Sequence, residues 1–421
     1  MERHTKIGNV CDDFNIFQLK SILVNNDSGD WGNEPDINAI GIIRSTNFNN
    51  DGKLDLSNVA YRTLTQRKFE EKKLYANDIL IERSGGSETQ PVGRVGFITD
   101  DIAKTDYAFA NFIQRISLNE SVNAKFVYYC LQQLYEMGIT AGMQSQTTGI
   151  RNIDWKQYIS IFLPQPSLPE QNRISTLLTQ VDEAILSVKR SISAAERLKK
   201  SLMQNLLTGR MKPDGTMRTE NEFYVDEKFG KVPEGWRWGQ LSEIADIIAG
   251  QSPQGEYYND NGIGVPMLNG PTEFTDHYPI PVQWTTKVTK LCKKGDILFT
   301  VRGSSTGRMN FADQEYCIGR GLAAIRPTND SDIQFIYYTL LKISEIILAE
   351  AKGAGTTFPN VCKSDLMKKV VLIPDNQYEI VKPICQADNI IIEKQTKITT
   401  LERLKKSLMQ NLLTGKVRVG D

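Results

Sequence analysis

A stretch of fourteen residues occurs twice in this chain without a single change. It reads Glu-Arg-Leu-Lys-Lys-Ser-Leu-Met-Gln-Asn-Leu-Leu-Thr-Gly from Glu196 to Gly209 and returns from Glu402 to Gly415, a shift of 206 residues. The identity ends abruptly on both sides of each copy. A repeat this long divides a chain of 421 residues into halves that are each large enough for a hydrophobic core. We therefore expect two matched segments, each preceded by a region that is free to differ.

Apolar residues with helical spacing precede each copy. Apolar residues step alternately by four and three positions in the first half, and the same register continues in the second. This spacing is the seam of a coiled coil. We predict that two long antiparallel helices pair through Ile174, Leu178, Val181, Ile185, Val188, Ile192, Ile384, Ile391, Ile398 and Leu401. The alternative is a helix that only covers its own domain, but about 40 residues span about 60 Å, longer than such a lid needs.

The helix ends can also be predicted. Leu168-Pro-Glu170 suits a helix start, because proline is tolerated in the first turn and glutamate complements the helix dipole. Gly209 stands where a left-handed C-terminal cap belongs. Pro383 lacks an N–H, so we expect it to kink the second helix or delay its start, with the regular part running from about that residue.

The regions before the helices read as short strands with a late helix, in the same order in both halves. Asp78-Ile-Leu80 matches Asp296-Ile-Leu298, and the helical stretch 126–134 matches 335–343. The sequence therefore predicts an α+β chain with two homologous mixed domains separated by two long antiparallel helices that form a coiled coil. The predicted parts are a first domain at 1–165, a first helix at 166–211, a linker and second domain at 212–374, and a second helix at 375–421.

Composition excludes several classes of protein. Fifty basic and fifty acidic residues leave no net charge, so a polyanion must meet a local patch. The six scattered cysteines have no C-x-x-C spacing, which fits reduced thiols in a cytoplasm. The N-terminus lacks the apolar core of a signal peptide, and no apolar run is long enough for a membrane helix. We expect a cytoplasmic protein with no membrane partner.

The motifs of common nucleic-acid enzymes are missing. There is no G-x-x-x-x-G-K-[ST] loop for ATP, and no Asn-Pro-Pro-aromatic or Asp-Pro-Pro-aromatic tetrapeptide of the kind that amino-methyltransferases use. Two histidines leave little for mechanisms built on paired imidazoles. We predict a chain with no catalytic residue, no bound cofactor and no metal site.

Polar loops at the ends of strands recur at matching places in both halves. Arginine reads guanine bidentately, glutamine and asparagine read adenine, and serine or threonine contacts phosphates or bases. The side chains differ between the halves, which predicts two readers of different sequence. The candidate DNA contacts are Arg44, Asn47, Arg83, Ser87, Gln90, Arg94, Gln144 and Gln146 in the first half, and Gln251, Gln254, Arg302, Ser304, Ser305, Arg308, Thr356 and Thr357 in the second.

The arrangement resembles the specificity subunit of type I restriction-modification systems over the whole chain. The motifs that carry the resemblance are Leu168-Pro-Glu-Gln171 with Ile174 and Asp182, Pro233-Glu-Gly-Trp236, Gly295-Asp-Ile-Leu298 and the duplicated Leu-Leu-Thr-Gly. The chain departs from the family pattern where Asp13-Phe14 replaces the Pro-Glu-Gly-Trp opening, and at Asn376-Gln-Tyr-Glu379, where no Leu-Pro-Glu-Gln is found.

The resemblance implies a non-enzymatic subunit that reads a bipartite target in double-stranded DNA. It implies that the paired helices set the gap between the half-sites and dock two methyltransferase subunits, through which restriction/translocase subunits join. Methyl donor, ATP and magnesium then belong to the partners. Three alternatives stay open: an enzyme that modifies or cuts DNA itself, a coiled-coil adaptor for protein contacts alone, and a DNA-binding protein that acts only with methyltransferase subunits.

Overall fold

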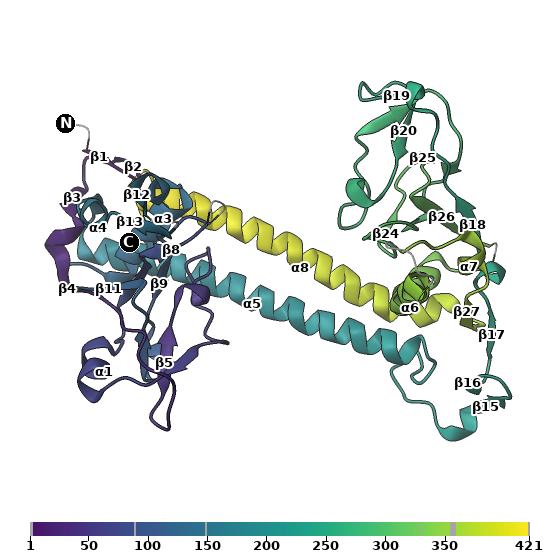
Figure 1. Ribbon diagram of the computed structural model, residues 1–421, viewed down its shortest axis with the longest axis horizontal. Coiled ribbons are helices and arrows are strands. Elements are labelled where there is room, and N and C mark those ends of the chain that lie inside the picture. Colours follow the sequence, from purple (N-terminus) through teal and green to yellow (C-terminus); the bar gives the residue numbers. More distant parts are fainter. Residues whose placement is uncertain (1–2, 88–89, 148–149, 329, 354–358, 420–421) are drawn as a thin grey trace. The chain divides into compact units, whose positions relative to one another are not determined.

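The chain forms two compact units in the computed structural model, which describes residues 3–87, 90–147, 150–328, 330–353 and 359–419 (Figure 1). Unit 1 comprises Met1–Lys189 and Thr396–Asp421, and unit 2 comprises Arg190–Gln395. Both boundaries fall inside long helices, at positions that the 206-residue repeat makes equivalent. The structure thus groups the residues differently from the sequence-based partition, because each half of each long helix packs with one unit.

Unit 1 is built around a four-stranded sheet in the order β4-β11-β7-β9, with a three-stranded sheet β10-β5-β6 beside it. Its strands are β1 (Arg3–Thr5), β2 (Gly8–Val10), β3 (Asn15–Gln18), β4 (Leu23–Ser28), β5 (Ile40–Ile43), β6 (Ala60–Arg62), β7 (Ile79–Glu82), β8 (Ser84–Gly85), β9 (Val95–Phe97), β10 (Tyr107–Phe109), β11 (Ile113–Leu118), β12 (Gln144–Thr147), β13 (Ile150–Ile153) and β14 (Phe162–Gln165). Its short helices are α1 (Gln66–Lys72), α2 (Asp100–Ala103), α3 (Ala124–Glu136) and α4 (Trp155–Ile159).

Unit 2 repeats this plan with the four-stranded order β18-β26-β23-β24 and a five-stranded sheet β19-β21-β20-β25-β22. Its strands are β15 (Phe223–Asp226), β16 (Gly230–Pro233), β17 (Trp236–Gln240), β18 (Ala245–Ala249), β19 (Tyr258–Asn259), β20 (Val265–Leu268), β21 (Gln283–Thr285), β22 (Leu291–Cys292), β23 (Ile297–Thr300), β24 (Met309–Phe311), β25 (Tyr316–Ile318), β26 (Leu322–Pro327) and β27 (Val370–Pro374). Its shorter helices are α6 (Ile333–Gly353) and α7 (Lys363–Met367).

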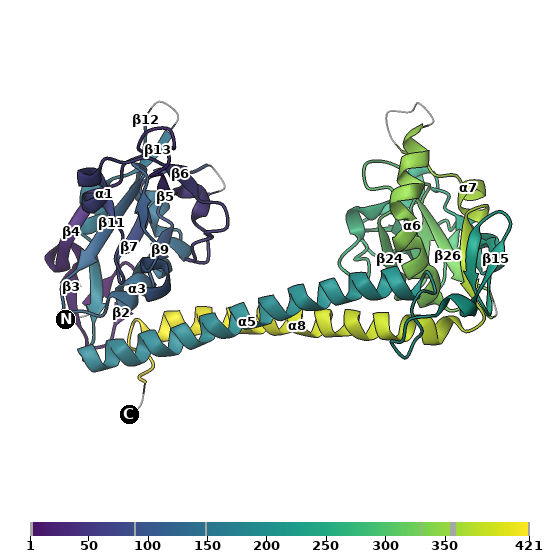
Figure 2. The ribbon, with the colours of Figure 1, turned by 90° about the horizontal axis from the view of Figure 1, so that it is seen from below.

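The two units share topology as well as element order. The central strand β11 pairs antiparallel with β4 and β7, as β26 pairs with β18 and β23. In each unit a parallel pair, β5 with β10 or β20 with β25, belongs to the second sheet. The late helix, α3 or α6, packs its buried aromatic face into the same core as the central sheet (Figure 2). This confirms the prediction of two homologous mixed domains.

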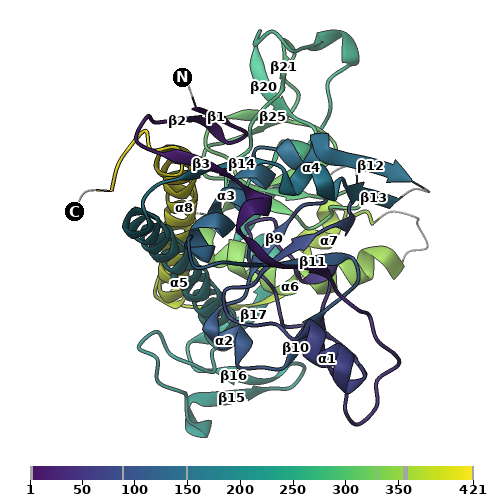
Figure 3. The same cartoon turned by 90° about the vertical axis from the view of Figure 1, so that its left-hand side faces the viewer.

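The two long helices are α5 (Leu168–Leu206) and α8 (Gln377–Leu412). Within unit 1 they run antiparallel, because Asp182 of α5 pairs with Lys405 at 2.9 Å and Lys189 lies 3.9 Å from Glu402. Within unit 2, Lys199 of α5 pairs with Asp388 of α8 at 2.5 Å. Figure 3 shows the helices side by side when viewed nearly along their axes. The expected pair of long antiparallel helices is present.

Each copy of the repeated segment enters the core of the half that it does not follow in sequence. Leu206 and Leu207 end the first copy and belong to the core of unit 2. Met409, Leu412 and Leu413 of the second copy belong to the core of unit 1. Burying these side chains removes apolar surface from water and so stabilises each contact. Each long helix therefore contributes buried side chains to both hydrophobic cores. The exact repeat therefore marks two equivalent docking positions.

The expectation that the regular part of the second helix begins at about Pro383 is wrong. Helix α8 begins at Gln377, and Pro383 lies inside it. The missing N–H removes one backbone hydrogen bond, but Ile380, Val381 and Ile384 are buried in the core of unit 2. Asn376 also caps the helix, since its side chain accepts a hydrogen bond from the backbone N–H of Glu379 at 3.3 Å. Packing and capping thus extend the helix toward its N-terminus.

Both departures from the family pattern keep the same structural role with different residues. Phe14 is buried beside Gly415 as Trp236 is buried beside Gly209, so an aromatic ring covers each left-handed helix end. At the helix starts, Gln171 accepts a hydrogen bond from the N–H of Asn123 at 2.8 Å. Gln377 does the same for Asp332 at 2.8 Å.

Candidate nucleic-acid interface

The strands β7 and β23 end at equivalent places, and each is followed by a short bridge to a later loop. In unit 1, Ser84 pairs with Asn152, and the Ser84 hydroxyl lies 2.6 Å from the Asn152 amide oxygen. In unit 2, Arg302 bridges Asn360, and its Nε donates to the amide oxygen of Asn360 at 3.1 Å. One position thus carries a short hydroxyl in one unit and a long cationic fork in the other.

An open groove of about 740 Å³ lies beside Arg302 in unit 2. Its walls bring together two predicted side chains, Gln251 and Arg302, with two that the sequence reasoning missed, Asn269 and Arg320. Gln251, Arg302 and Arg320 are exposed, and Asn269 is half-buried. Two guanidinium groups and two amides around one groove match the groups that read base edges and phosphates.

Glycine residues allow the backbone segments that line this groove to lie close together. A Cβ on Gly250 would collide with the carbonyl oxygens of Gly319, Ile318 and Leu322, so only glycine fits there. A Cβ on Gly321 would likewise collide with the carbonyl of Asn269. The backbone N–H of Arg320, between two glycines, donates to the Ser252 hydroxyl at 3.1 Å. The Gly-Arg-Gly turn after β25 was the sequence signal that could have identified Arg320.

The candidates in unit 1 are mostly half-buried or engaged in loop contacts. Arg83 is half-buried, with both its backbone N–H and its carbonyl paired. The exposed Ser87 accepts at its carbonyl from Arg151 at 3.0 Å, which makes Arg151 a further cation at this edge. Gln90 donates to Asn50 at 2.9 Å, and Gln144 donates to the Thr140 carbonyl at 3.4 Å.

Two predicted base readers are buried and have structural roles instead. Arg94 is buried and paired with the Glu82 carboxylate at 2.7 Å. Its guanidinium also donates to the carbonyls of Ser45, at 3.0 Å, and Phe48. Because every face of this fork is used inside the protein, Arg94 is not available to DNA. It clamps the 3-10 turn η2 (Ser45–Asn47) to the sheet.

Arg308 makes a similar clamp in unit 2 but stays exposed, so its contact with DNA remains a prediction. Its Nη1 donates to the carbonyl of Pro271 at 3.1 Å and its Nη2 to that of Phe274 at 2.9 Å, around the turn η7 (Pro271–Glu273). Asn47 is the second correction. It is 2% exposed, and its amide bonds the backbone N–H of Arg44 and the carbonyls of Asp55 and Asn58.

The remaining candidates stay predictions. Gln254 and Ser304 are exposed, and Arg44 and Ser305 are half-buried. Gln146 lies on β12, and its side chain is outside the described residues, as are Thr356 and Thr357. Of the helix-pairing residues, Ile174, Leu178, Val181, Ile185, Val188, Ile384 and Ile391 are buried, and Ile192, Ile398 and Leu401 are half-buried.

A matched cluster fixes each late helix to the two long helices. In unit 1, the Tyr129 hydroxyl donates to Asp182 at 2.9 Å, and the same carboxylate pairs with Lys405. In unit 2, Tyr338 donates to Asp388 at 2.5 Å, and Lys199 completes the cluster. Burial, followed by the neighbouring carboxylate, raises the pKa of both tyrosine hydroxyls, so they remain protonated donors. Both lysines come from the repeated segment.

The comparison with known families agrees with this geometry. The model of the type I restriction modification DNA specificity domain matches residues 13–197 and 233–403. The chain belongs to this specificity family.

Relatives match along nearly the whole length. The putative type I restriction enzyme MjaX specificity subunit of Methanocaldococcus jannaschii is 29% identical over 425 residues, which cover 99% of this chain and 96% of the relative. The MjaVIII specificity subunit of the same organism is 24% identical and covers 82% of this chain and 80% of its own.

Solved structures share the fold. The S subunit of a type I restriction-modification system from M. genitalium has a TM-score of 0.60 at 15% identity and covers 98% of this chain and 99% of its own. A chain from a study of assembly and conformational transition of the type I R-M system has a TM-score of 0.56 at 21% identity, with 97% and 99% covered. At such identities the likeness shows the specificity-family fold alone.

The Gly-Asp-Ile-Leu motif of the specificity family is structural in this chain. Asp296 accepts a hydrogen bond from the N–H of Lys293 at 2.8 Å and pairs with Arg326 at 2.7 Å. In unit 1, Asp78 accepts from the N–H of Tyr75 at 2.9 Å and from the Ser117 hydroxyl at 2.6 Å. Both carboxylates fasten a turn to the central sheet.

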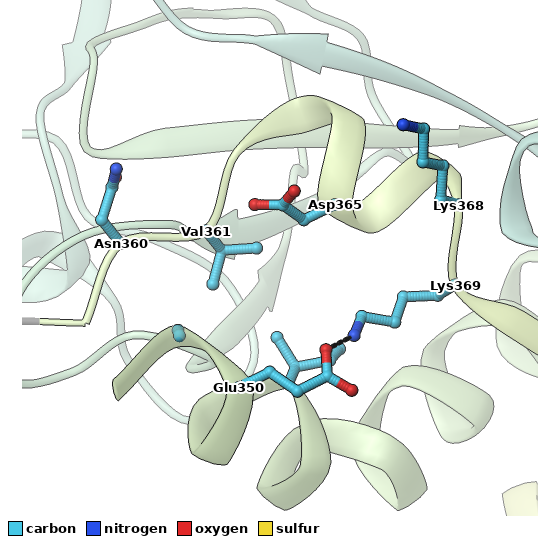
Figure 4. Close-up of a pocket in the computed structure, with 8 residues that line it drawn as sticks. Glu350, Asn360, Val361, Asp365, Lys368 and Lys369 are labelled. Atoms are coloured by element: carbon cyan, nitrogen blue, oxygen red, sulfur yellow. Dashed lines mark hydrogen bonds and ion pairs between the residues drawn. The ribbon is translucent and has the colours of Figure 1, made fainter. Parts of the chain in front are cut away.

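A cavity of about 390 Å³ lies between α6 and α7 and is lined by both acidic and basic side chains (Figure 4). Glu350 points toward Lys369 and forms an ion pair with it. The Asp365 carboxylate accepts from the N–H of Cys362 at 2.9 Å, which caps α7. Glu350, Lys369 and Asp365 are thus engaged in an ion pair or a helix cap.

The described residues lack the side-chain clusters of a metal site and the helices of a membrane span. Across the described ranges, no group of three or more histidine, cysteine, aspartate and glutamate side chains could hold a metal ion. Among the same residues, no helix has the length and apolarity needed to cross a membrane.

Proposed function

We propose that this chain is the non-catalytic DNA-reading subunit of a type I restriction-modification complex. Each unit recognises one part of a bipartite target in double-stranded DNA. The long helices set the gap between the parts and dock two methyltransferase subunits, through which restriction/translocase subunits join. Methyl donor, ATP and magnesium bind to those partners.

The matched strand ends carry this proposal. The two units have one topology, yet the position after the strand holds Ser84 in unit 1 and Arg302 in unit 2. A fold that is kept while the side chain at this strand end changes is what two readers of different half-sites require. Membership of the specificity family supports the same assignment.

The test is DNA-stimulated methylation with purified components. The chain is mixed with the methyltransferase subunit of its system, labelled methyl donor and host DNA, and the methylated motif is sequenced. We expect a split motif with a fixed gap, and no methylation, cleavage or ATP hydrolysis by the chain alone. Turnover by a nuclease-free preparation of the single chain would contradict the proposal.

The partner set is tested in the same reaction. Adding the restriction subunit, ATP and magnesium to unmethylated DNA is expected to give cleavage. Methylation without any cleavage would show a subunit that acts only with methyltransferase subunits. Partner binding without any DNA dependence would show an adaptor.

A further inference from the structure

Unit 2 contains a cavity of about 680 Å³ that is separate from the groove around Arg302. It lies where the C-terminal end of α5, the hairpin β15–β16, helix α6 and strand β27 meet. The two sites share no lining residue. Figure 1 shows β15 and β16 at the opposite end of unit 2 from β19 and β20. A ligand in this cavity therefore leaves the groove open.

The charged lining is strongly basic. It consists of Arg210, Arg218, Lys231, Lys342 and the single acid Glu220. Lys231 forms an ion pair with Glu220, and Arg218 donates to the carbonyl of Gly209 at 2.7 Å. Arg210 and Lys342 have no carboxylate within ion-pair distance in the part of the chain that the structure describes. Arg218 likewise has no carboxylate partner among the described residues, so the cavity keeps three cations that are not neutralised.

Lys342 is held in place inside this cavity. Its Nζ donates to the carbonyl of Leu207 at 3.1 Å, at the end of α5. Burial, and then the nearby Arg210, lower the pKa of Lys342. A carboxylate placed beside these two groups would reverse that effect and favour the charged lysine.

The walls of the cavity are apolar and partly open to solvent. Met217, Ile346 and Val370 are 58%, 57% and 43% exposed, which is unusual for large apolar side chains grouped around one cavity. The indole Nε1 of Trp238 is buried and has no acceptor among the described residues.

We propose that this cavity binds an acidic, apolar peptide segment of a partner subunit. Its carboxylates face Arg210 and Lys342, and its large apolar side chains cover Met217 and Ile346. Phosphodiester backbone supplies the charge but no apolar surface, so DNA fits the walls poorly. This inference rests on the proposed function, in which the chain acts within a complex.

Unit 1 offers a matched control. Counting from the equivalent Tyr129 and Tyr338, Gln133 stands where unit 2 has Lys342, and Met137 stands where it has Ile346. Gln133 is buried and Met137 is 46% exposed. The equivalent helix position in unit 1 thus carries no cation and is covered, while the position of Met137 is exposed like that of Ile346.

Photocrosslinking of the full chain tests the occupant. Benzoylphenylalanine replaces Ile346 in one sample and Met137 in another, and each is assembled with purified methyltransferase and restriction subunits and duplex DNA. We expect the Ile346 probe to crosslink to a partner segment that contains aspartate or glutamate beside large apolar residues. Crosslinks to DNA only, or none in a complex that forms, would overturn the proposal.

Charge substitutions provide the second measurement. Arg210→Glu together with Lys342→Glu is expected to weaken partner binding at least tenfold, while Met137→Glu, at an exposed position of the equivalent helix in unit 1, leaves it unchanged. Lys342→Gln introduces the amide of unit 1 and is expected to weaken binding about threefold with an unchanged melting temperature. Unchanged affinity in folded variants would overturn the site but leave the proposed function intact. If the unmodified chain bound no partner, the proposed function would fail first.

Discussion

At the scale of single residues, Arg94 and Glu82 form a buried ion pair in unit 1. Their side chains are 8% and 1% exposed. Arg94→Ala leaves the carboxylate buried without a cation, so we expect a loss of about 3–5 kcal/mol in the unfolding free energy. Chemical denaturation followed by circular dichroism measures it. Arg67→Ala, on a side chain that is 90% exposed, serves as the control and is expected to change stability by less than about 0.5 kcal/mol.

Arg302 and Arg308 of unit 2 are expected to differ in role, since Arg302 lines the groove and Arg308 holds a turn in place. If Arg302 makes a bidentate base contact, Arg302→Ala is expected to relax discrimination at one base of one half-site by about 1–3 kcal/mol. Arg308→Ala removes hydrogen bonds to two carbonyls, so it is expected to lower stability by about 1–3 kcal/mol without changing which base is preferred. Competition binding with single-base variants of the target, beside thermal unfolding, distinguishes them. An equal loss of affinity for all sequences in Arg302→Ala would indicate a phosphate contact.

At the scale of elements, the tyrosine–aspartate–lysine clusters join each late helix to the long helices. Lys199→Met and Lys405→Met keep the apolar stem but remove the charge that meets Asp388 or Asp182. We expect each to cost about 1–3 kcal/mol, because a charge-assisted bond to a largely buried carboxylate is lost. Hydrogen exchange is expected to show Lys199→Met loosening unit 2 and Lys405→Met loosening unit 1. Loosening of the half that precedes each lysine in sequence would contradict the docking described above.

At the scale of the whole molecule, the unit boundaries at Lys189 and Gln395 are equivalent positions in the repeat. Seven residues inserted after each keep the seam in register and lengthen each helix by about 10 Å. We expect the unspecific gap in the DNA target to grow by about three base pairs, at about 3.4 Å per pair, while both half-sites stay the same. DNA twist will favour the spacing that returns the second groove to its unit. Methylome sequencing of a host carrying the variant measures the gap, and an unchanged gap at full activity would show that the helices do not set it.

Sequence alone determined the features that depend on local spacing. The exact repeat, the alternating seam and the strand pattern predicted two homologous domains and two long helices. These signals are readable because helices repeat every 3.6 residues and strands every two. The position of Gly209 also predicted a left-handed helix cap, and Gly209 has a φ of 65°. Gly415, at the same place in the second copy, has a φ of 73°.

Only the tertiary structure decided which segments meet. The first repeat copy docks on unit 2 and the second on unit 1, and no local pattern encodes that choice. Arg94 and Arg302 both stand next to strands in the sequence. Arg94 pairs with a buried carboxylate, however, whereas Arg302 lines a groove. Arg320 became a candidate only through its place beside Arg302. The reason is physical: burial and hydrogen-bond partners are set by residues far away in the chain, whereas periodicity is set by neighbours.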